Sequence, residues 1–280
     1  IAWVPGALLA MRRVIAPVGE ARNDTDILAD LAARLGFGPA FTAGRGEMDW
    51  IRLLYDDTRT GGSSLPPFED FWRDGVVPLP EAPRPVALFV PLRDDPQRRP
   101  LLTPSGKIEL FSARIAGFGL DDCPGHGAWL APREWLGAEL SRRYPLHLIS
   151  NQPRARLHSQ YDAGAASQAS KIAWHEPIRI HPVDAARRGI SDGDVVRVVN
   201  DRGACLAGAA VSDAIRPGVV QMATGAWYAA AARGEVDPGG NVNVLTRDAG
   251  ASRLSQGSSA MSCLVEVEKA VDSSAPRLPR

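Results

Sequence analysis

The stretch DVVRVVNDRGACLAGAAVS, residues 194–212, decides the fold of this chain. It holds two runs rich in β-branched and small apolar residues, joined by a turn that contains glycine. Short runs of the same kind surround it, and one short helix is predicted over residues 181–190, between Pro182 and Gly189. These runs are LHLIS, PIRIHP, GVVQMAT and SCLVEVEK. Short strands at close spacing with a single inserted helix predict a compact β-barrel after Tyr144.

The first half of the chain has a different character. The spacing predicts a capped amphipathic helix over residues 23–35 and a second packing helix over 48–55. Residues 60–104 are rich in proline, which breaks regular elements, and LLTPSGKIELFS at 101–112 predicts a hairpin that turns at Thr103 to Gly106. We therefore expect a mixed α+β chain with a domain boundary near residue 140, dividing 1–140 from 141–280.

Bulk composition excludes several classes of protein. The 32 basic and 32 acidic residues cancel to a net charge of +0, which argues against a surface that attracts nucleic acid or anionic membrane as a whole. The 3 cysteines lie far apart, so neither a disulfide framework nor a zinc site is predicted. No apolar run approaches the roughly 18 residues that a membrane span requires.

The chain begins in an unusual way. Its first residue is Ile1, and an apolar stretch is already under way there. We expect a fragment of a longer protein, whose signal region, if it has one, is not present here.

The strongest chemical signal is SNQPRARLHSQYD, residues 150–162, which follows an apolar run. It offers neutral donors and acceptors together with the cationic Arg154 and Arg156. Guanidinium groups pair with phosphate oxygens, and amides and hydroxyls can bind the edges of a ring. The mixture predicts a nucleotide-like ligand rather than a metal ion. Neither a Gly-rich dinucleotide fingerprint nor a phosphate-binding P-loop occurs in the sequence.

Four separated motifs carry a resemblance to a known family. The segment from LISNQPRARLHSQ to GAWY, together with PVGEARNDTDI, LTPSGKIELFS and GNVNVLTRDAGASRLSQG, resembles the C-terminal part of the dimethyl sulfoxide reductase family of molybdopterin oxidoreductases. The motif RLHSQ is similar to the branch of biotin sulfoxide and trimethylamine N-oxide reductases. The motifs occur in the family's order over nearly the whole chain.

The resemblance implies a fold, a cofactor and a set of contacts. The fold is a six-stranded double-psi β-barrel over 141–280, preceded by a helical and proline-rich segment that belongs to domains missing here. The cofactor is bis(molybdopterin guanine dinucleotide) molybdenum. The implied cofactor-binding residues are Ser150, Asn151, Gln152, Arg156, Leu157, His158, Ser159, Gln160, Asn243 and Gln256. No catalytic residue and no metal ligand is assigned, because the family's serine ligand to molybdenum lies before the part that matches.

The implied function is reduction of S-oxides or N-oxides by oxygen-atom transfer, with a small-molecule oxide as substrate and an electron donor protein as partner. Such an enzyme is bacterial and periplasmic or cytoplasmic, and this chain alone should lack complete chemistry. Two alternatives stay open: a stand-alone cofactor-binding module without catalysis, since fold does not fix function, and a formate- or nitrate-type branch of the same family. The sequence upstream of Ile1 would distinguish them.

Overall fold

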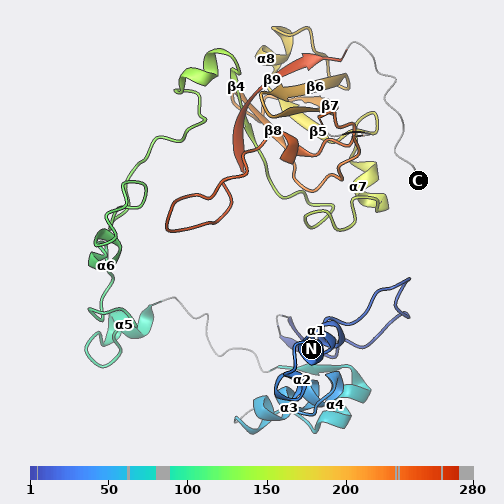
Figure 1. Ribbon diagram of the computed structural model, residues 1–280, viewed down its shortest axis with the longest axis vertical. Helices are drawn as coiled ribbons and strands as arrows, with labels where there is room; N and C mark the ends of the chain where they lie inside the picture. Colours follow the sequence, from blue (N-terminus) through green and yellow to red (C-terminus); the bar gives the residue numbers. More distant parts are fainter. Residues whose placement is uncertain are drawn as a thin grey trace. The chain divides into compact units, whose positions relative to one another are not determined.

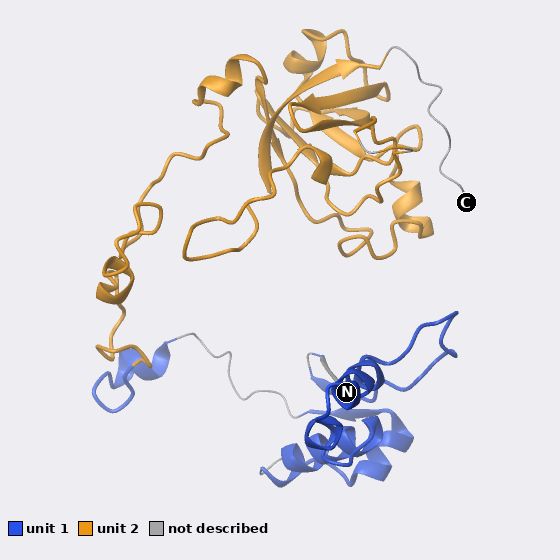
Figure 2. Ribbon diagram, in the orientation of Figure 1, with its two compact units in different colours: residues 1–100 blue, residues 101–280 orange. Residues whose placement is uncertain are grey.

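The computed structural model describes residues 1–4, 6–61, 64–79, 89–230, 232, 234–259 and 261–270. These residues form two compact units, 1–100 and 101–280 (Figure 2). The predicted boundary near residue 140 concerns the domains of a longer protein, and it stays a prediction. None of the described helices is long and apolar enough to cross a membrane.

Unit 1–100 contains short helices and a small antiparallel sheet. The sheet has the order β1 (Ala2–Val4), β2 (Ala7–Leu9), β3 (Val76–Pro78). The helices are α1 (Asp24–Arg34), α2 (Gly38–Thr42), α3 (Glu47–Thr60), α4 (Phe68–Asp74) and α5 (Val90–Asp94). Their core gathers Leu8, Tyr55, Leu65, Phe68 and Phe71, with the rings of Tyr55 and Phe71 stacked at 4.6 Å. Both helices predicted from the sequence are confirmed.

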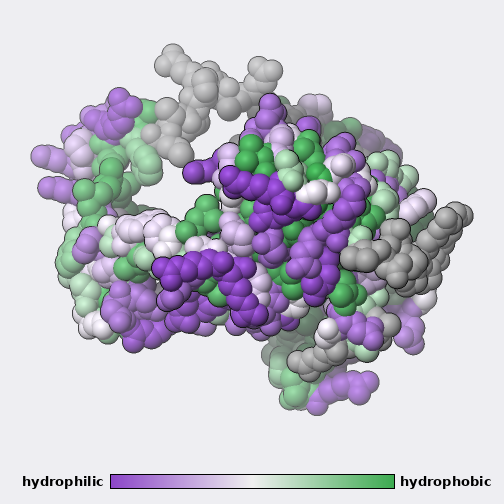
Figure 3. All heavy atoms as spheres, turned by 90° about the horizontal axis from the view of Figure 1, so that it is seen from above, coloured by the Kyte–Doolittle hydropathy of each residue, from purple (hydrophilic) through white to green (hydrophobic). Residues whose placement is uncertain are grey.

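Helix α1 has the predicted cap and the predicted apolar stripe, but the stripe is not buried. The side chain of Asn23 accepts a hydrogen bond from the Thr25 N–H at 2.9 Å. The stripe residues Ile27, Leu28, Leu31 and Leu35 are 46% to 63% exposed. Exposed hydrophobic residues are not confined to this helix: Figure 3 shows them (green) at the surface among hydrophilic ones (purple).

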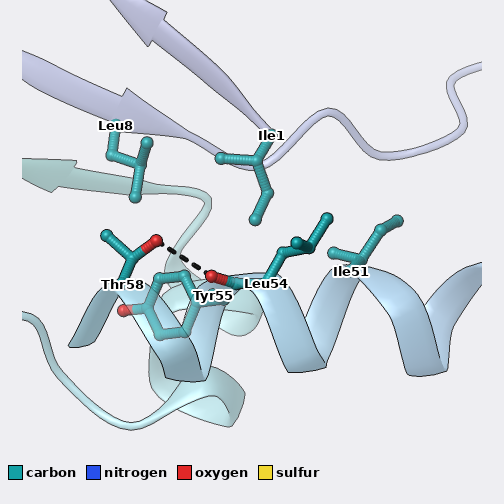
Figure 4. A pocket seen from close by; sticks show the side chains of 6 residues that line it. All are labelled: Ile1, Leu8, Ile51, Leu54, Tyr55 and Thr58. Atoms are coloured by element: carbon teal, nitrogen blue, oxygen red, sulfur yellow. Dashed lines mark hydrogen bonds between the residues drawn. The ribbon is translucent and has the colours of Figure 1, made fainter. Parts of the chain in front are cut away.

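A small apolar pocket of about 240 Å³ lies beside α3 (Figure 4). Its lining is Ile1, Leu8, Ile51, Leu54, Tyr55 and Thr58. The Thr58 hydroxyl donates to the Leu54 carbonyl at 2.9 Å, within the helix itself. Because no set of polar groups converges on this pocket, it is not a candidate for specific ligand chemistry.

An extended segment leads from residue 101 to the barrel and carries α6 (Ala113–Ala116) and η1 (Glu139–Arg142) (Figure 1). The predicted turn is present, since the Gly106 N–H donates to the Thr103 carbonyl at 2.9 Å. The predicted hairpin strands are wrong: residues 101–112 form no strand pair. Leu102 and Leu110 stay exposed, and a two-stranded ladder without a buried apolar face is marginal in water.

The remainder of unit 101–280 is a closed six-stranded barrel (Figure 1). Its strands, in the order around the barrel, are β4 (Leu146–Ile149), β8 (Val219–Met222), β5 (Pro177–Ile180), β7 (Gly203–Val211), β6 (Val195–Asn200) and β9 (Ser262–Lys269). The pairs β4–β8 and β5–β7 are parallel and the other four are antiparallel. The predicted double-psi β-barrel is confirmed.

Alternation in the strands fills the barrel. Along β6 every second residue, Val196, Val198 and Asn200, is buried. On the neighbouring strand β7 the buried residues include the small Ala207 and Ala209, which take up little of the barrel interior. Two helices, α7 (Ala165–Ala169) and α8 (Pro182–Ala186), and the short η2 (Val242–Val244) lie in the connections. Because apolar strand residues make up the core of the barrel, the polar side chains of interest lie in the loops at the strand ends.

Candidate functional site

The polar loop that follows β4 is joined to two other parts of the barrel. The Ser150 N–H donates to the Met261 carbonyl at 2.9 Å, just before β9 begins. The Asn151 carbonyl accepts from the Thr224 N–H at 2.9 Å, just after β8 ends. The start of the loop is therefore held by two other segments, the one before β9 and the one after β8.

Residues 157–161 form a tight turn, which we call the recognition turn. It closes with a hydrogen bond from the Gln160 N–H to the Leu157 carbonyl at 2.9 Å. His158 and Tyr161 have φ of 49° and 65°, a region that costs energy in residues with a Cβ. All five side chains are exposed. The turn thus presents a hydroxyl, an amide and an imidazole outward from a strained backbone.

Four buried charged residues lie beneath the recognition turn, and we call them the charge quartet. Arg156 binds Glu176 at 2.9 Å, and Lys171 binds Asp162 at 2.9 Å and Glu176 at 2.8 Å. A guanidinium nitrogen of Arg156 lies 3.6 Å from a carboxylate oxygen of Asp162. All four side chains are 6% exposed or less. The two cations and two anions balance, which burial of charge requires.

The quartet also affects the ionisation of Asp162. Burial by itself would raise the pKa of this carboxyl. The hydrogen bonds from Lys171 and from the Trp227 N–H outweigh burial, with further attraction from Lys171 and Arg156, and hold the pKa of Asp162 below its ordinary range. Asp162 is therefore an anion in the folded protein at neutral pH.

A loop after β8 fastens the recognition turn from the other side. The indole N–H of Trp227 donates to the Ser159 carbonyl at 2.9 Å, and its backbone N–H donates to Asp162 at 3.1 Å. The Thr224 carbonyl accepts from the Arg156 guanidinium at 2.8 Å. Gly225, with φ of 94°, lies against the His158 carbonyl so closely that a Cβ would collide with it.

Unpaired polar atoms concentrate in β4 and in the polar loop that follows it. Among the described residues, four buried side-chain atoms have no hydrogen-bond partner: His147 Nε2, Ser150 Oγ, Asn151 Oδ1 and Arg156 Nε. All four fall within ten residues of sequence. Since a buried polar atom without a partner costs about 1–3 kcal/mol, such a concentration indicates a place where a ligand completes the hydrogen bonding.

A second group of predicted residues lines a polar cavity of about 670 Å³. Asn243 and Gln256 both lie on its wall, together with Thr246, Arg247, Asp248, Ala249, Gly250 and Ser258. The Asn243 N–H donates to the side-chain oxygen of Asn241 at 3.0 Å, and the Gln256 amide donates to the Ser252 carbonyl at 2.9 Å. Two residues predicted from separate parts of the motif thus share one cavity.

Comparison with known proteins identifies the barrel. Residues 146–264 match the family model described as "Molydopterin dinucleotide binding domain". This part of the chain is a molybdopterin dinucleotide-binding domain. The match begins at the first residue of β4 and ends inside β9, so it spans the strands that close the barrel.

The chain as a whole is similar to bacterial oxide reductases. It is 46% identical to the "Dimethyl sulfoxide/trimethylamine N-oxide reductase" of Cereibacter sphaeroides, over 94% of this chain and 33% of that protein. It is 46% identical to the "Biotin sulfoxide reductase" of the same organism, over 93% and 35%. It is 44% identical to "Trimethylamine-N-oxide reductase 1" of Escherichia coli K12, over 94% and 32%. The chain spans about a third of the length of these relatives.

A solved structure shares the fold. "Acetylene Hydratase from Pelobacter acetylenicus" matches with a TM-score of 0.67 and 19% identity, covering 95% of this chain and 35% of that one. The sequence and family comparisons confirm the resemblance inferred from the motifs and the class of cofactor that it implied.

The site residues of the molybdopterin dinucleotide-binding domain fall into two groups. Ser150 to Gln160 share the loop after β4, and Asn243 and Gln256 share the polar cavity. The first group holds three of the four unpaired buried atoms, whose donor and acceptor mixture fits the ring edges and phosphates of a dinucleotide. Which of these residues contact the cofactor stays a prediction.

Arg156 occupies a different environment from the one that its sequence context suggests. Two of its guanidinium nitrogens are already bound within the protein, to Ser167, Glu176 and the Thr224 carbonyl. Only Nε is unpaired. We therefore expect Arg156 to act mainly by fixing the loop. His181, by contrast, accepts from the Val183 N–H at 3.2 Å and caps the start of α8.

From the sequence, Trp227 is marked only as part of the GAWY motif, and Asp162, Lys171 and Glu176 are given no role in the site. The signal that could have found them is positional. Arg156 and Asp162 flank one tight turn, and Lys171 and Glu176 flank another.

Proposed function

We propose that the protein carrying this chain is a bacterial molybdenum oxidoreductase that removes oxygen from an S-oxide or an N-oxide, and that the barrel holds bis(molybdopterin guanine dinucleotide) molybdenum. The substrate would be of the dimethyl sulfoxide, biotin sulfoxide or trimethylamine N-oxide type, the chemistry named for the three relatives described above. An electron donor protein would reduce the enzyme. We infer a periplasmic or cytoplasmic location, to be decided by fractionation of the source cells.

In this proposal the cofactor, when bound, supplies oxygen-atom transfer, and the residues of this chain supply binding and orientation. The recognition turn would donate from Ser159 and Gln160. The loop start would offer Ser150 and Asn151, whose buried atoms lack partners in the protein. Asn243 and Gln256 would bind a separate part of the dinucleotide in the polar cavity.

The observation that supports this proposal best is the set of unpaired buried atoms. Three of the four lie in Ser150, Asn151 and Arg156, inside the loop that the family motif marks. A loop that served only as a structural turn would be expected to satisfy its own buried polar groups. The exposed residues of the recognition turn also make few side-chain contacts with the protein, which leaves them available to a ligand.

The proposal is tested by the molybdenum and guanine nucleotide content of the protein at its natural length. Ser159→Ala and Gln160→Ala should each lower cofactor content severalfold, because unsatisfied cofactor atoms cost about 1–3 kcal/mol each. Their thermal midpoints in the cofactor-free form should stay close to wild type. Gln97→Ala, an exposed glutamine in the other unit, is the matched control and should keep full content. Full occupancy in both variants would show that the loop is a structural turn.

A further inference from the structure

Two tight turns beside the barrel share one design. The recognition turn lies between Arg156 and Asp162. A second turn closes between Ile172 and His175 through two hydrogen bonds of 2.9 and 3.0 Å, and it lies between Lys171 and Glu176. Each turn is therefore flanked by one buried cation and one buried anion.

The backbones of the two turns are strained in the same way. Ala173 and Trp174 have φ of 47° and 72°, and His158 and Tyr161 have φ of 49° and 65°. None of the four is glycine. Residues with a Cβ hold such conformations only where surrounding contacts enforce them. The charged residues at the ends of each turn are the nearest candidates for that enforcement.

The charges pair between the turns as well as within them. Arg156 of the first turn binds Glu176 of the second at 2.9 Å, and Lys171 of the second binds Asp162 of the first at 2.9 Å. Lys171 also binds Glu176 across its own turn at 2.8 Å. The second turn is thereby joined to the first through side chains that are almost fully buried.

We propose that Lys171 and Glu176 are positioning residues for the molybdopterin dinucleotide: through Arg156 and Asp162 they hold the recognition turn in its binding conformation. This inference rests on the proposed function, because it assumes that the recognition turn contacts the cofactor. Neither residue needs to touch the ligand. Their side chains are 4% and 3% exposed and are bound within the quartet.

Energetics favour this role over a purely stabilising one. Desolvation of four charges offsets most of their mutual attraction, so apolar side chains of similar volume would often be as stable. What an ion network provides that apolar packing does not is directional hydrogen bonding. Here that bonding fixes both ends of a five-residue turn. A site that hydrogen-bonds to the edge of a ring requires its side chains to be held in a precise position.

The test compares release of guanine nucleotide from folded holoprotein, at a temperature well below unfolding, in Lys171→Met, Glu176→Gln and the double variant. Each single change leaves an unbalanced buried charge and should speed release at least about tenfold. The double variant restores the charge balance around Arg156 and Asp162 but not the ion pairs that hold them, so it should fold more stably than either single variant and still release nucleotide several-fold faster than wild type. Lys171→Arg keeps the charge and should stay within about threefold of wild type.

A matched control separates positioning from general loss of stability. Val198→Ala removes buried barrel volume, lowers the thermal midpoint, and should leave the release rate nearly unchanged. Wild-type release from both single variants would overturn the positioning role, provided that Gln160→Ala still loses cofactor. Unchanged release from Gln160→Ala and Ser159→Ala would instead overturn the proposed function. If a single variant does not fold, the double variant carries the test, and release of nucleotide from it at the wild-type rate overturns the inference.

Discussion

Arg202 donates both terminal nitrogens to the two carboxylate oxygens of Glu134, at 2.7 and 2.9 Å. The same carboxylate accepts from the Leu264 N–H in β9 at 3.0 Å, and Arg202 donates from Nε to the Leu245 carbonyl at 2.7 Å. Glu134 lies before the first strand of the barrel. This bidentate pair therefore fastens the segment that enters the barrel to the turn after β6 and to the last strand.

Removing the charge of Glu134 should destabilise the barrel. Glu134→Gln leaves Arg202 without its ion partner, and we expect a loss of about 2 kcal/mol in the free energy of unfolding, less than for a fully buried pair because Arg202 is 30% exposed. Glu268→Gln breaks an exposed pair with Arg197 and should cost about 1 kcal/mol or less. Urea unfolding measures both, and equal losses would contradict the account.

Acid should weaken the fold through two carboxylates. Burial opposes ionisation of Glu134, but hydrogen bonds from Arg202 and the Leu264 N–H lower its pKa, and the pKa of Asp162 is lowered as well. A lowered pKa gives stability that is complete above the unfolded value, about 4, and is lost as pH falls through the folded value. Urea midpoints should fall steeply below about pH 4. In Glu134→Gln this fall should be smaller, and an unchanged slope would exclude Glu134 as a contributor.

Gly225 is required for the approach of two loops. Gly225→Ala puts a Cβ into the His158 carbonyl at a φ of 94°, so we expect displacement of the recognition turn and a stability loss above the 1–3 kcal/mol of backbone strain alone. Gly193→Ala is the control, with φ of 83° and no atom within 4 Å of the added carbon, and should show only the strain. Thermal unfolding compares the two. Similar losses would mean that the close approach is not important.

The cysteines should differ sharply in reactivity. Cys205 and Cys263 are fully buried, and burial raises the pKa of both thiols, that of Cys263 to about 12. Cys123 is partly exposed. Since the thiolate is the reactive form, a thiol reagent should label Cys123 quickly in the folded protein and all 3 cysteines after denaturation. Rapid labelling of Cys263 in the native state would show that β9 opens.

The barrel was predictable because its signals are local. Alternation in residues 195–200 and glycine turns mark each strand, and their spacing fixes a compact β-domain before any contact is known. The pairing order is not local. Parallel β4–β8 joins residues about 70 positions apart, so six strands in a double-psi arrangement followed only from the family resemblance.

The site was predictable in composition but not in roles. The polar loop after β4 was evident, yet sequence cannot show that Arg156 is buried against Glu176, twenty residues away. The same limit applies to α1. Its apolar stripe predicted packing, but a stripe specifies only what a helix could bury, and Leu31 is 50% exposed.

The central claim is that the barrel holds a molybdopterin guanine dinucleotide, and nucleotide analysis of the purified protein at its natural length tests it most directly. Acid hydrolysis followed by chromatography identifies the released base, and metal analysis gives molybdenum per chain. The account predicts guanine nucleotide and molybdenum in a ratio of about two to one, as the bis form of the cofactor requires. Molybdenum-free protein without bound nucleotide, or release of another nucleobase, would contradict it.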